Sequence, residues 1–310
     1  MRLVRMSPLK FFKLVEILEP HKAFSGRMSK QREVAFQIAL VLIRLGSTAD
    51  RVHTMAKRYK ISLVTIGMLE ARVVSAILDK MKSYATWPRN PTDIVHGTSQ
   101  DSAPASHSTN RVGYLAAGKI YLAFAPTYRK TEFVAPEDTD ITRGEAFCIR
   151  VLAVISPTTN RFMHFYAGKP GSVSSSSLLK SSLLFRKQKK IFRNDQHILT
   201  DTGSRENSDT HGAIPYRMEQ FLTLFELNNG EYKETTADRT SQDAARAIGQ
   251  TAWMWKTIFR QLNSLHIRIQ GEKSLKEANS AIVATVYLFN YLQPTAEYVR
   301  TLIRLDGMGT

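Results

Sequence analysis

Cysteine and long apolar runs are the two things that the sequence has least of. Its single cysteine, Cys148, cannot form a disulfide within the chain, which suits a reducing compartment such as the cytosol or the nucleus. The longest apolar stretch, residues 281–289, is far shorter than the roughly 20 residues that a transmembrane helix needs. Residues 1–30 scatter basic side chains among apolar ones. We therefore expect neither a membrane span nor a signal peptide.

Acidic residues are also scarce. The 310 residues contain 43 Lys and Arg against 27 Asp and Glu, which gives a formal net charge of +16. Residues 1–90 hold 17 basic and 6 acidic side chains and so carry +11 of that charge. A basic segment of this kind favours a polyanionic partner, with nucleic acid the first expectation and a merely solvated basic surface the alternative. The apolar content of 43% is ordinary for a folded protein.

Residues 1–85 have the periodicity of helices. Ser7 and Pro8 form a typical helix start, and an apolar helix is predicted over 31–46, closed by Gly46. Two further helices are predicted on either side of a short turn, the second of them capped by Ser62. Two helices joined so tightly indicate a helix-turn-helix, whose second helix can enter a major groove of DNA.

The remainder of the chain has a different pattern. Residues 86–110 are rich in Pro, Ser, Thr and Asn and are interpreted as a polar linker. Residues 111–310 are predicted to form a mixed α/β domain. Its expected strands are 118–126, 146–157, 162–168 and one that ends at Asp201, and its expected late helices are 241–263 and 274–293.

Several segments, taken in order, resemble the Harbinger/PIF-type transposases and their domesticated, transposase-derived nuclease relatives. The opening "RMSPLKFFKLVEILEP" and the helix-turn-helix region are similar to the start of that family. Further along, "AGKPGSVSSSSLL", "ILTDTGS" and "IVATVYLFNYL" resemble three of its landmarks in the expected order. The likeness covers nearly the whole chain.

The resemblance implies a ribonuclease-H-like fold with three acidic residues that hold two divalent metal ions for phosphoryl transfer. Only the second acid, Asp201, is present. The resemblance places the first acid at Ala117 and the third at Gly249, and it places Ser174 and Ser175 where the family has a histidine–aspartate pair.

One carboxylate cannot hold two Mg²⁺ ions, because magnesium keeps most of its waters and binds a single ligand weakly. We therefore expect a catalytically inactive nuclease fold with no resident cofactor, and Mg²⁺ or Mn²⁺ only if some activity persists. Glu145, Glu206 and Asp209 are nearby acids that could substitute in principle, whereas Asp243 would face away from position 249 on the predicted helix.

Basic side chains around the helix-turn-helix are the expected DNA contacts. The second helix has few long polar side chains to reach base edges, since Leu63 and Gly67 occupy early positions. Phosphate contacts with little sequence preference are therefore expected. The candidate DNA-binding residues are Arg51, Lys57, Arg58, Lys60, Thr65 and Arg72.

A second basic segment, residues 185–193, is either a phosphate-contacting or nuclear-import segment or a solvated loop. Its basic residues include Arg186, Lys187, Lys189 and Lys190.

These expectations favour a nuclear protein that binds DNA or chromatin without cutting it. Two alternatives stay open: a protein-interaction scaffold that works through the helical domain, and an active divalent-metal-dependent endonuclease.

Overall fold

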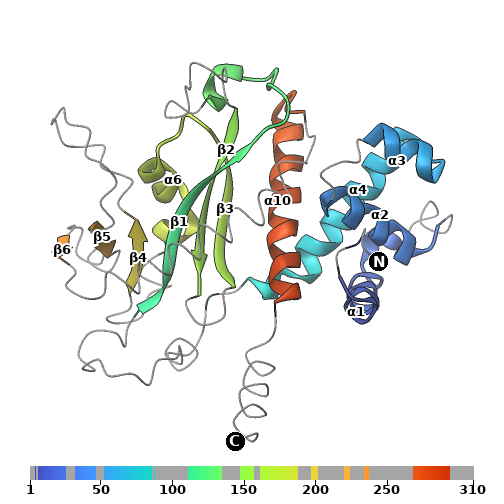
Figure 1. The fold of residues 1–310 in the computed structure, drawn as a ribbon, viewed down its shortest axis with the longest axis horizontal. Coiled ribbons are helices and arrows are strands. Elements are labelled where there is room, and N and C mark those ends of the chain that lie inside the picture. Colours follow the sequence, from blue (N-terminus) through green and yellow to red (C-terminus); the bar gives the residue numbers. More distant parts are fainter. Residues whose placement is uncertain are drawn as a thin grey trace, which may run out of the picture.

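In a computed structural model of the chain, the elements occur in the order shown in Figure 1. The structure describes residues 4, 6–25, 32–46, 52–85, 87, 111–134, 147–156, 161–187, 197–201, 220–223, 234–236 and 268–293. The predicted helix 241–263, together with Arg51, Lys189, Lys190 and Gly249, lies outside the described residues.

The amino-terminal part is helical, as its periodicity predicts. Ser7 caps the first helix by accepting a hydrogen bond from the backbone N–H of Lys10, and Pro8 occupies the first helical position. The helices are α1 (Pro8–Leu18), α2 (Val34–Gly46), α3 (Val52–Tyr59) and α4 (Leu63–Lys80), with short 3₁₀ turns η1 (Lys22–Phe24) and η3 (Lys82–Tyr84).

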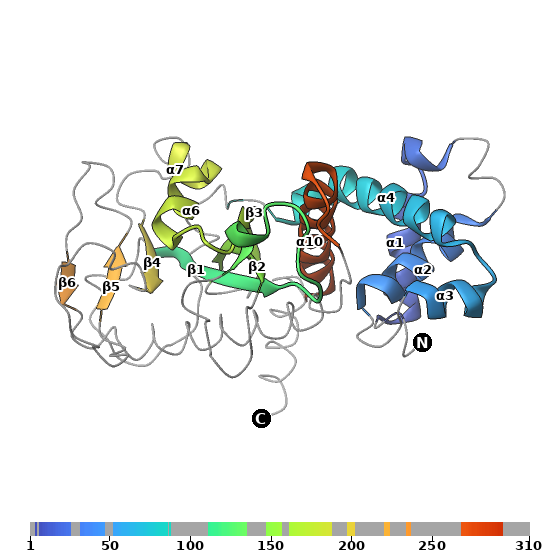
Figure 2. The same cartoon turned by 90° about the horizontal axis from the view of Figure 1, so that it is seen from above.

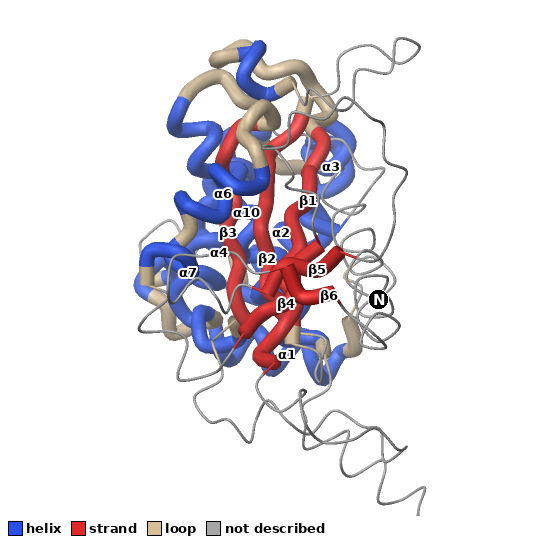
Figure 3. The backbone as a smooth tube through the Cα atoms, turned by 90° about the vertical axis from the view of Figure 1, so that its left-hand side faces the viewer, coloured by secondary structure: helices blue, strands red, loops and turns tan. Residues whose placement is uncertain are grey.

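A six-stranded mixed sheet in the order β3-β2-β1-β4-β5-β6 follows, and Figure 3 shows β3, β2 and β1 side by side. β1 is antiparallel to β2, β2 is antiparallel to β3, and β4 is parallel to β1 on its other side. β5 and β6 extend this edge with antiparallel pairing. The strands are β1 (Arg111–Tyr121), β2 (Cys148–Ile155), β3 (Phe162–Pro170), β4 (His197–Asp201), β5 (Gln220–Thr223) and β6 (Glu234–Thr236). The mixed α/β prediction is confirmed.

The first predicted strand, 118–126, is wrong at both ends. β1 begins at Arg111 and ends at Tyr121, and the chain then leaves the sheet, so that Phe124 is exposed. The early half of β1 was missed because "RVGYLAA" has one glycine and two alanines, which have low strand propensity. Pairing with β2 over the whole of Tyr114–Tyr121 overrides that propensity.

Helices cover both faces of the sheet. Val151, Ala153 and Ile155 of β2 belong to the larger buried cluster, together with α10 (Glu272–Leu292). The intervening Leu152 and Val154 belong to a second cluster with α6 (Ser175–Ser181) and α7 (Leu183–Arg186). Because successive strand residues point to opposite faces, α10 packs on one face and α6 with α7 on the other.

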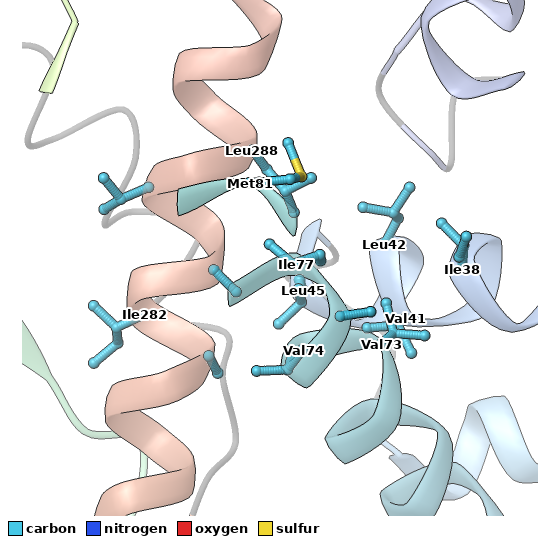
Figure 4. Close-up of a cluster of buried hydrophobic side chains, with 14 of the residues drawn as sticks. Ile38, Val41, Leu42, Leu45, Val73, Val74, Ile77, Met81, Ile282 and Leu288 are labelled. Carbon is cyan, nitrogen blue, oxygen red and sulfur yellow. The ribbon is translucent and has the colours of Figure 1, made fainter. Parts of the chain in front are cut away.

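α10 joins the sheet to the helical part. It contacts β3 on one side and α4 on the other (Figures 1 and 2). In Figure 4, Leu288 of α10 lies beside Met81 just beyond the end of α4, whereas Ile282 points to the other side of α10. The apolar side chains of α2 continue this cluster away from α10 (Figure 4). The buried core is therefore continuous from the sheet to the amino-terminal helices.

A buried asparagine reinforces this junction. Asn290 of α10 is fully buried, and its Oδ1 accepts a hydrogen bond of 2.9 Å from the backbone N–H of Phe162. Its Nδ2 donates to the carbonyl oxygens of Phe162 and Tyr84, each at 2.8 Å. One side chain thus satisfies backbone groups of β3 and of η3, which lie far apart in the sequence.

Candidate functional site

The turn between α3 and α4 has the geometry of a helix-turn-helix. The two helices are bent by 103° across residues 60–62, within the range typical of that motif. Lys60 adopts a left-handed conformation with φ of 52°. The backbone N–H groups of Lys60 and Ile61 donate to the carbonyls of Lys57 and Ala56 respectively. This pair of bonds is the Schellman ending of a helix, and it fixes the direction in which α4 leaves.

The second helix begins at a well-formed cap. The Oγ of Ser62 accepts a 3.0 Å hydrogen bond from the backbone N–H of Thr65, and its hydroxyl lies 2.8 Å from the Thr65 hydroxyl. Ile61 is buried beneath the turn. The turn is therefore a rigid element that presents the end of α3 and the start of α4 together.

Three of the predicted DNA-binding residues, Lys57, Arg58 and Lys60, lie exposed at the carboxyl end of α3 and in the turn. Positive charge at this point also favours the helix, because the last carbonyls of α3 carry partial negative charge. The three residues span four positions of the chain, so their positive charges lie close together. This group is the basic turn.

Two other predicted contacts have partners within the protein. Arg72 donates from Nη1 to the Oε1 of Gln37 at 2.9 Å, which ties α4 to α2. Thr65 packs its hydroxyl against the Ser62 cap. Both residues thus have a role within the protein, and the other described candidates for DNA contact are the three residues of the basic turn.

The exposed face at the start of α4 is apolar. Val64 is 73% exposed, Leu63 41% and Met68 39%, and the glycine between them adds no side chain. Reading base edges in the major groove requires hydrogen-bonding side chains such as Arg, Asn or Gln. The start of α4 therefore lacks the side chains for sequence readout that a recognition helix ordinarily carries.

No single helix among those described is both long and apolar enough to cross a bilayer. Among the described helices, α3 and α4 together reach that length and apolar character, but the chain is sharply bent between them at the turn described above.

Asp201 stands at the end of β4, beside β1. Leu115 of β1 pairs with Thr200 in the last pair of this register, and extending the register by one residue sets Ala116 opposite Asp201. Ala117 is one residue further along β1 and pairs with Leu152 on its other side. Ala117, the position that the resemblance gives to the first acid, is therefore offset by one residue from the position opposite Asp201.

This difference leaves the chemical conclusion unchanged, because β1 has no acidic residue at all: its sequence is RVGYLAAGKIY. β5, the other neighbour of β4, is QFLT and also has none. Within the described residues, no group of three potential metal ligands gathers anywhere. The two strands that flank Asp201 thus supply no second carboxylate for a two-metal site.

The serines that replace the histidine–aspartate pair begin a helix. Ser174 is the N-cap of α6, and its Oγ accepts a 3.2 Å hydrogen bond from the backbone N–H of Ser177. Gly171, just before it, is required by packing, because a Cβ there would overlap the carbonyl oxygen of Phe133 and approach the Cys148 sulfur to 2.8 Å. This segment therefore has a structural explanation.

The second basic segment is described only at its start. Arg186 ends α7 and Lys187 follows it, and both side chains are exposed. Lys189 and Lys190 lie outside the described residues.

Sequence reasoning missed two features. Asn290 was noticed only as part of a landmark, although an asparagine in an apolar helix signals a buried hydrogen-bonding role. The second is a groove between α4 and α10, which depends on the packing of distant segments and has no local sequence signal.

Comparisons with protein-family models, with curated proteins and with solved structures find no match to this chain.

Proposed function

We propose that the chain is a transposase-derived protein with a ribonuclease-H-like domain that binds duplex DNA with little sequence preference and does not cut it. The observation that carries DNA binding is the basic turn, held on a rigid helix-turn-helix with exposed Lys57, Arg58 and Lys60. The absence of long polar side chains on the exposed start of α4 supports weak sequence preference.

The sheet topology supports the ribonuclease-H-like part of the proposal. Three antiparallel strands are followed by β4, which lies parallel to β1 and brings Asp201 next to it. A two-metal site of that fold needs acids on both of these strands. The lack of any acid on β1 supports an inactive domain, in which Mg²⁺ or Mn²⁺ would have Asp201 as a single weak ligand. A nuclear location follows from the DNA-binding role.

A salt series tests the DNA-binding role. Each phosphate contact contributes about −0.9 to the slope of log K against log salt concentration for duplex DNA. Replacing Lys57 and Arg58 by Gln and Lys60 by Asn is expected to weaken binding of a random duplex and to reduce the slope by about 2 to 3. Asparagine is chosen at position 60 because it tolerates the left-handed conformation found there.

The matched control removes the same charge elsewhere, by Lys22→Gln, Lys80→Gln and Lys180→Gln, all of which are exposed. Equal slopes for the two triple variants would show that binding follows net charge rather than the basic turn. That result would contradict the proposal.

A protein-interaction scaffold is the second candidate function. The observation that favours it is the apolar start of α4, where Val64 is 73% exposed.

A further inference from the structure

One side of α4 exposes a stripe of apolar and small residues. Val64, Met68, Ala71 and Ser75 recur at intervals of three or four residues, so they lie on the same side of the helix, and Gly67 lies within the stripe. The opposite side of α4 is buried against the helical core, through residues such as Ile66, Leu69 and Val73. A surface helix normally exposes its polar side. α4 instead shows an apolar side to solvent.

This α4 stripe forms one wall of a groove of about 1060 Å³. The other wall is the first turns of α10 and the residues just before it, including Arg268, Lys273 and Ser280. The two walls converge at Val74 and Ala281, which are buried where the helices pack together. Figure 2 shows α4 running from this contact toward α3, away from α10. A ligand on the stripe would therefore be contacted from two sides.

The two walls differ in charge. Among the residues that line the groove, the α10 wall has exposed Arg268, Lys273 and Lys276 and one exposed carboxylate, Glu277; the exposed Glu272 at the start of α10 does not line it. On the α4 wall, Glu70 is paired with Arg44 at 3.0 Å. The remaining acid, Asp79, stands at the far end of the helix, where it lies 3.5 Å from His21. The groove thus has an apolar wall and a positively charged wall.

We propose that this groove binds an acidic amphipathic helix of a partner protein. Its apolar side would lie on the α4 stripe and its carboxylates would face Lys273 and Lys276, which is the helix-in-groove mode of recognition. The small residues Gly67, Ala71 and Ser75 are spaced four apart and allow the backbone of a second helix to come close. This surface is additional to the basic turn, and the proposal does not depend on DNA binding.

Charge and chemistry exclude the other occupants. In a two-fold dimer the same patch meets itself, so a second copy would bring two positively charged walls together in a chain that already carries +16. The stripe has no long side chain that could hydrogen-bond to the base edges of DNA. An acidic amphipathic helix complements both walls, because its apolar side matches the α4 stripe and its carboxylates match the positively charged α10 wall.

The test uses the full chain and a fluorescein-labelled helical peptide of about 18 residues, with Leu along one side and Glu on both flanks. The comparison peptide has the same leucines, with every Glu replaced by Lys. Fluorescence anisotropy is expected to show the acidic peptide binding at least about tenfold more tightly than the lysine peptide.

Position 67 offers a matched pair of variants, because a Cβ built there has no heavy atom within 4 Å. Gly67→Leu places a bulky side chain on the stripe and is expected to weaken binding of the acidic peptide by about tenfold or more. Gly67→Ala is expected to leave that affinity nearly unchanged. Both variants should melt at or above the wild-type temperature, since glycine is the poorer helix former.

A charge reversal gives the second, independent arm. Lys273→Glu with Lys276→Glu is expected to shift the preference toward the lysine peptide, whereas Lys180→Glu with Lys187→Glu, on α6 and beside α7, is not. Equal binding of the two peptides, or wild-type affinity in Gly67→Leu, would overturn the proposal. Displacement of the acidic peptide by random duplex, combined with its loss on changing the basic turn, would assign the stripe to the DNA interface instead.

Discussion

Replacing Asn290 by alanine is expected to lower the free energy of unfolding by about 4 kcal/mol, the largest single effect that we anticipate. The substitution removes the three hydrogen bonds that the fully buried Asn290 side chain makes with the N–H and C=O of Phe162 and with the C=O of Tyr84. Each buried backbone group that loses its hydrogen bond costs about 1–3 kcal/mol. Denaturant unfolding followed by circular dichroism measures the change.

Asn279→Ala is the matched control, since Asn279 is the same residue type on the same helix. Its Oδ1 is buried but accepts no hydrogen bond within the part of the chain that the structure describes, so alanine there is expected to cost about 1 kcal/mol or less. Equal shifts of the unfolding midpoint in the two variants would show that the Asn290 hydrogen bonds add nothing beyond the volume of the side chain.

The second large effect is a dependence of stability on pH that comes from His164. This histidine lies on β3, largely buried, and its Nε2 has no hydrogen-bond partner among the described residues. Burial penalises the charged imidazolium and lowers the pKa of His164 from 6.5 to about 4. The unfolded chain therefore takes up a proton at a higher pH than the folded chain does.

It follows that the contribution of neutral His164 to the free energy of unfolding is complete above about pH 6.5 and is lost as the pH falls toward 4. The loss reaches about 3 kcal/mol, because each unit of pKa difference is worth about 1.4 kcal/mol. His164→Phe removes the titrating group, so the stability of this variant should fall less than that of the wild type between pH 7 and pH 4. If the stability of the two proteins fell equally between pH 7 and pH 4, His164 would not be the source of the pH dependence. An NMR titration of the imidazole gives the pKa directly.

Local patterns predicted the helical part and the central strands well, because their causes are local. Ser7 and Ser62 cap the helices that they were expected to cap, and β2 and β3 fall within one or two residues of the predicted runs. The first strand was misplaced because β1 is determined by pairing with β2 and β4 rather than by its own residues. Such long-range pairing leaves no trace in a short window of sequence.

The candidate site was predicted only in part, for the same reason. The basic turn could be located from its residues, whereas the partner of Arg72 on another helix could not. Two of the landmarks behind the family resemblance have structural explanations here: Gly171 fits closely beneath Phe133, and Asn290 hydrogen-bonds two distant segments.

The most direct test of binding without cutting is one incubation of the full chain with a labelled random duplex at low salt in the presence of Mn²⁺. Our account predicts a retarded and intact duplex, whose retardation weakens as salt is raised. Cleavage that is abolished by Asp201→Asn would contradict it, because a functioning metal site would then exist in a sheet where β1 and β5 supply no acid.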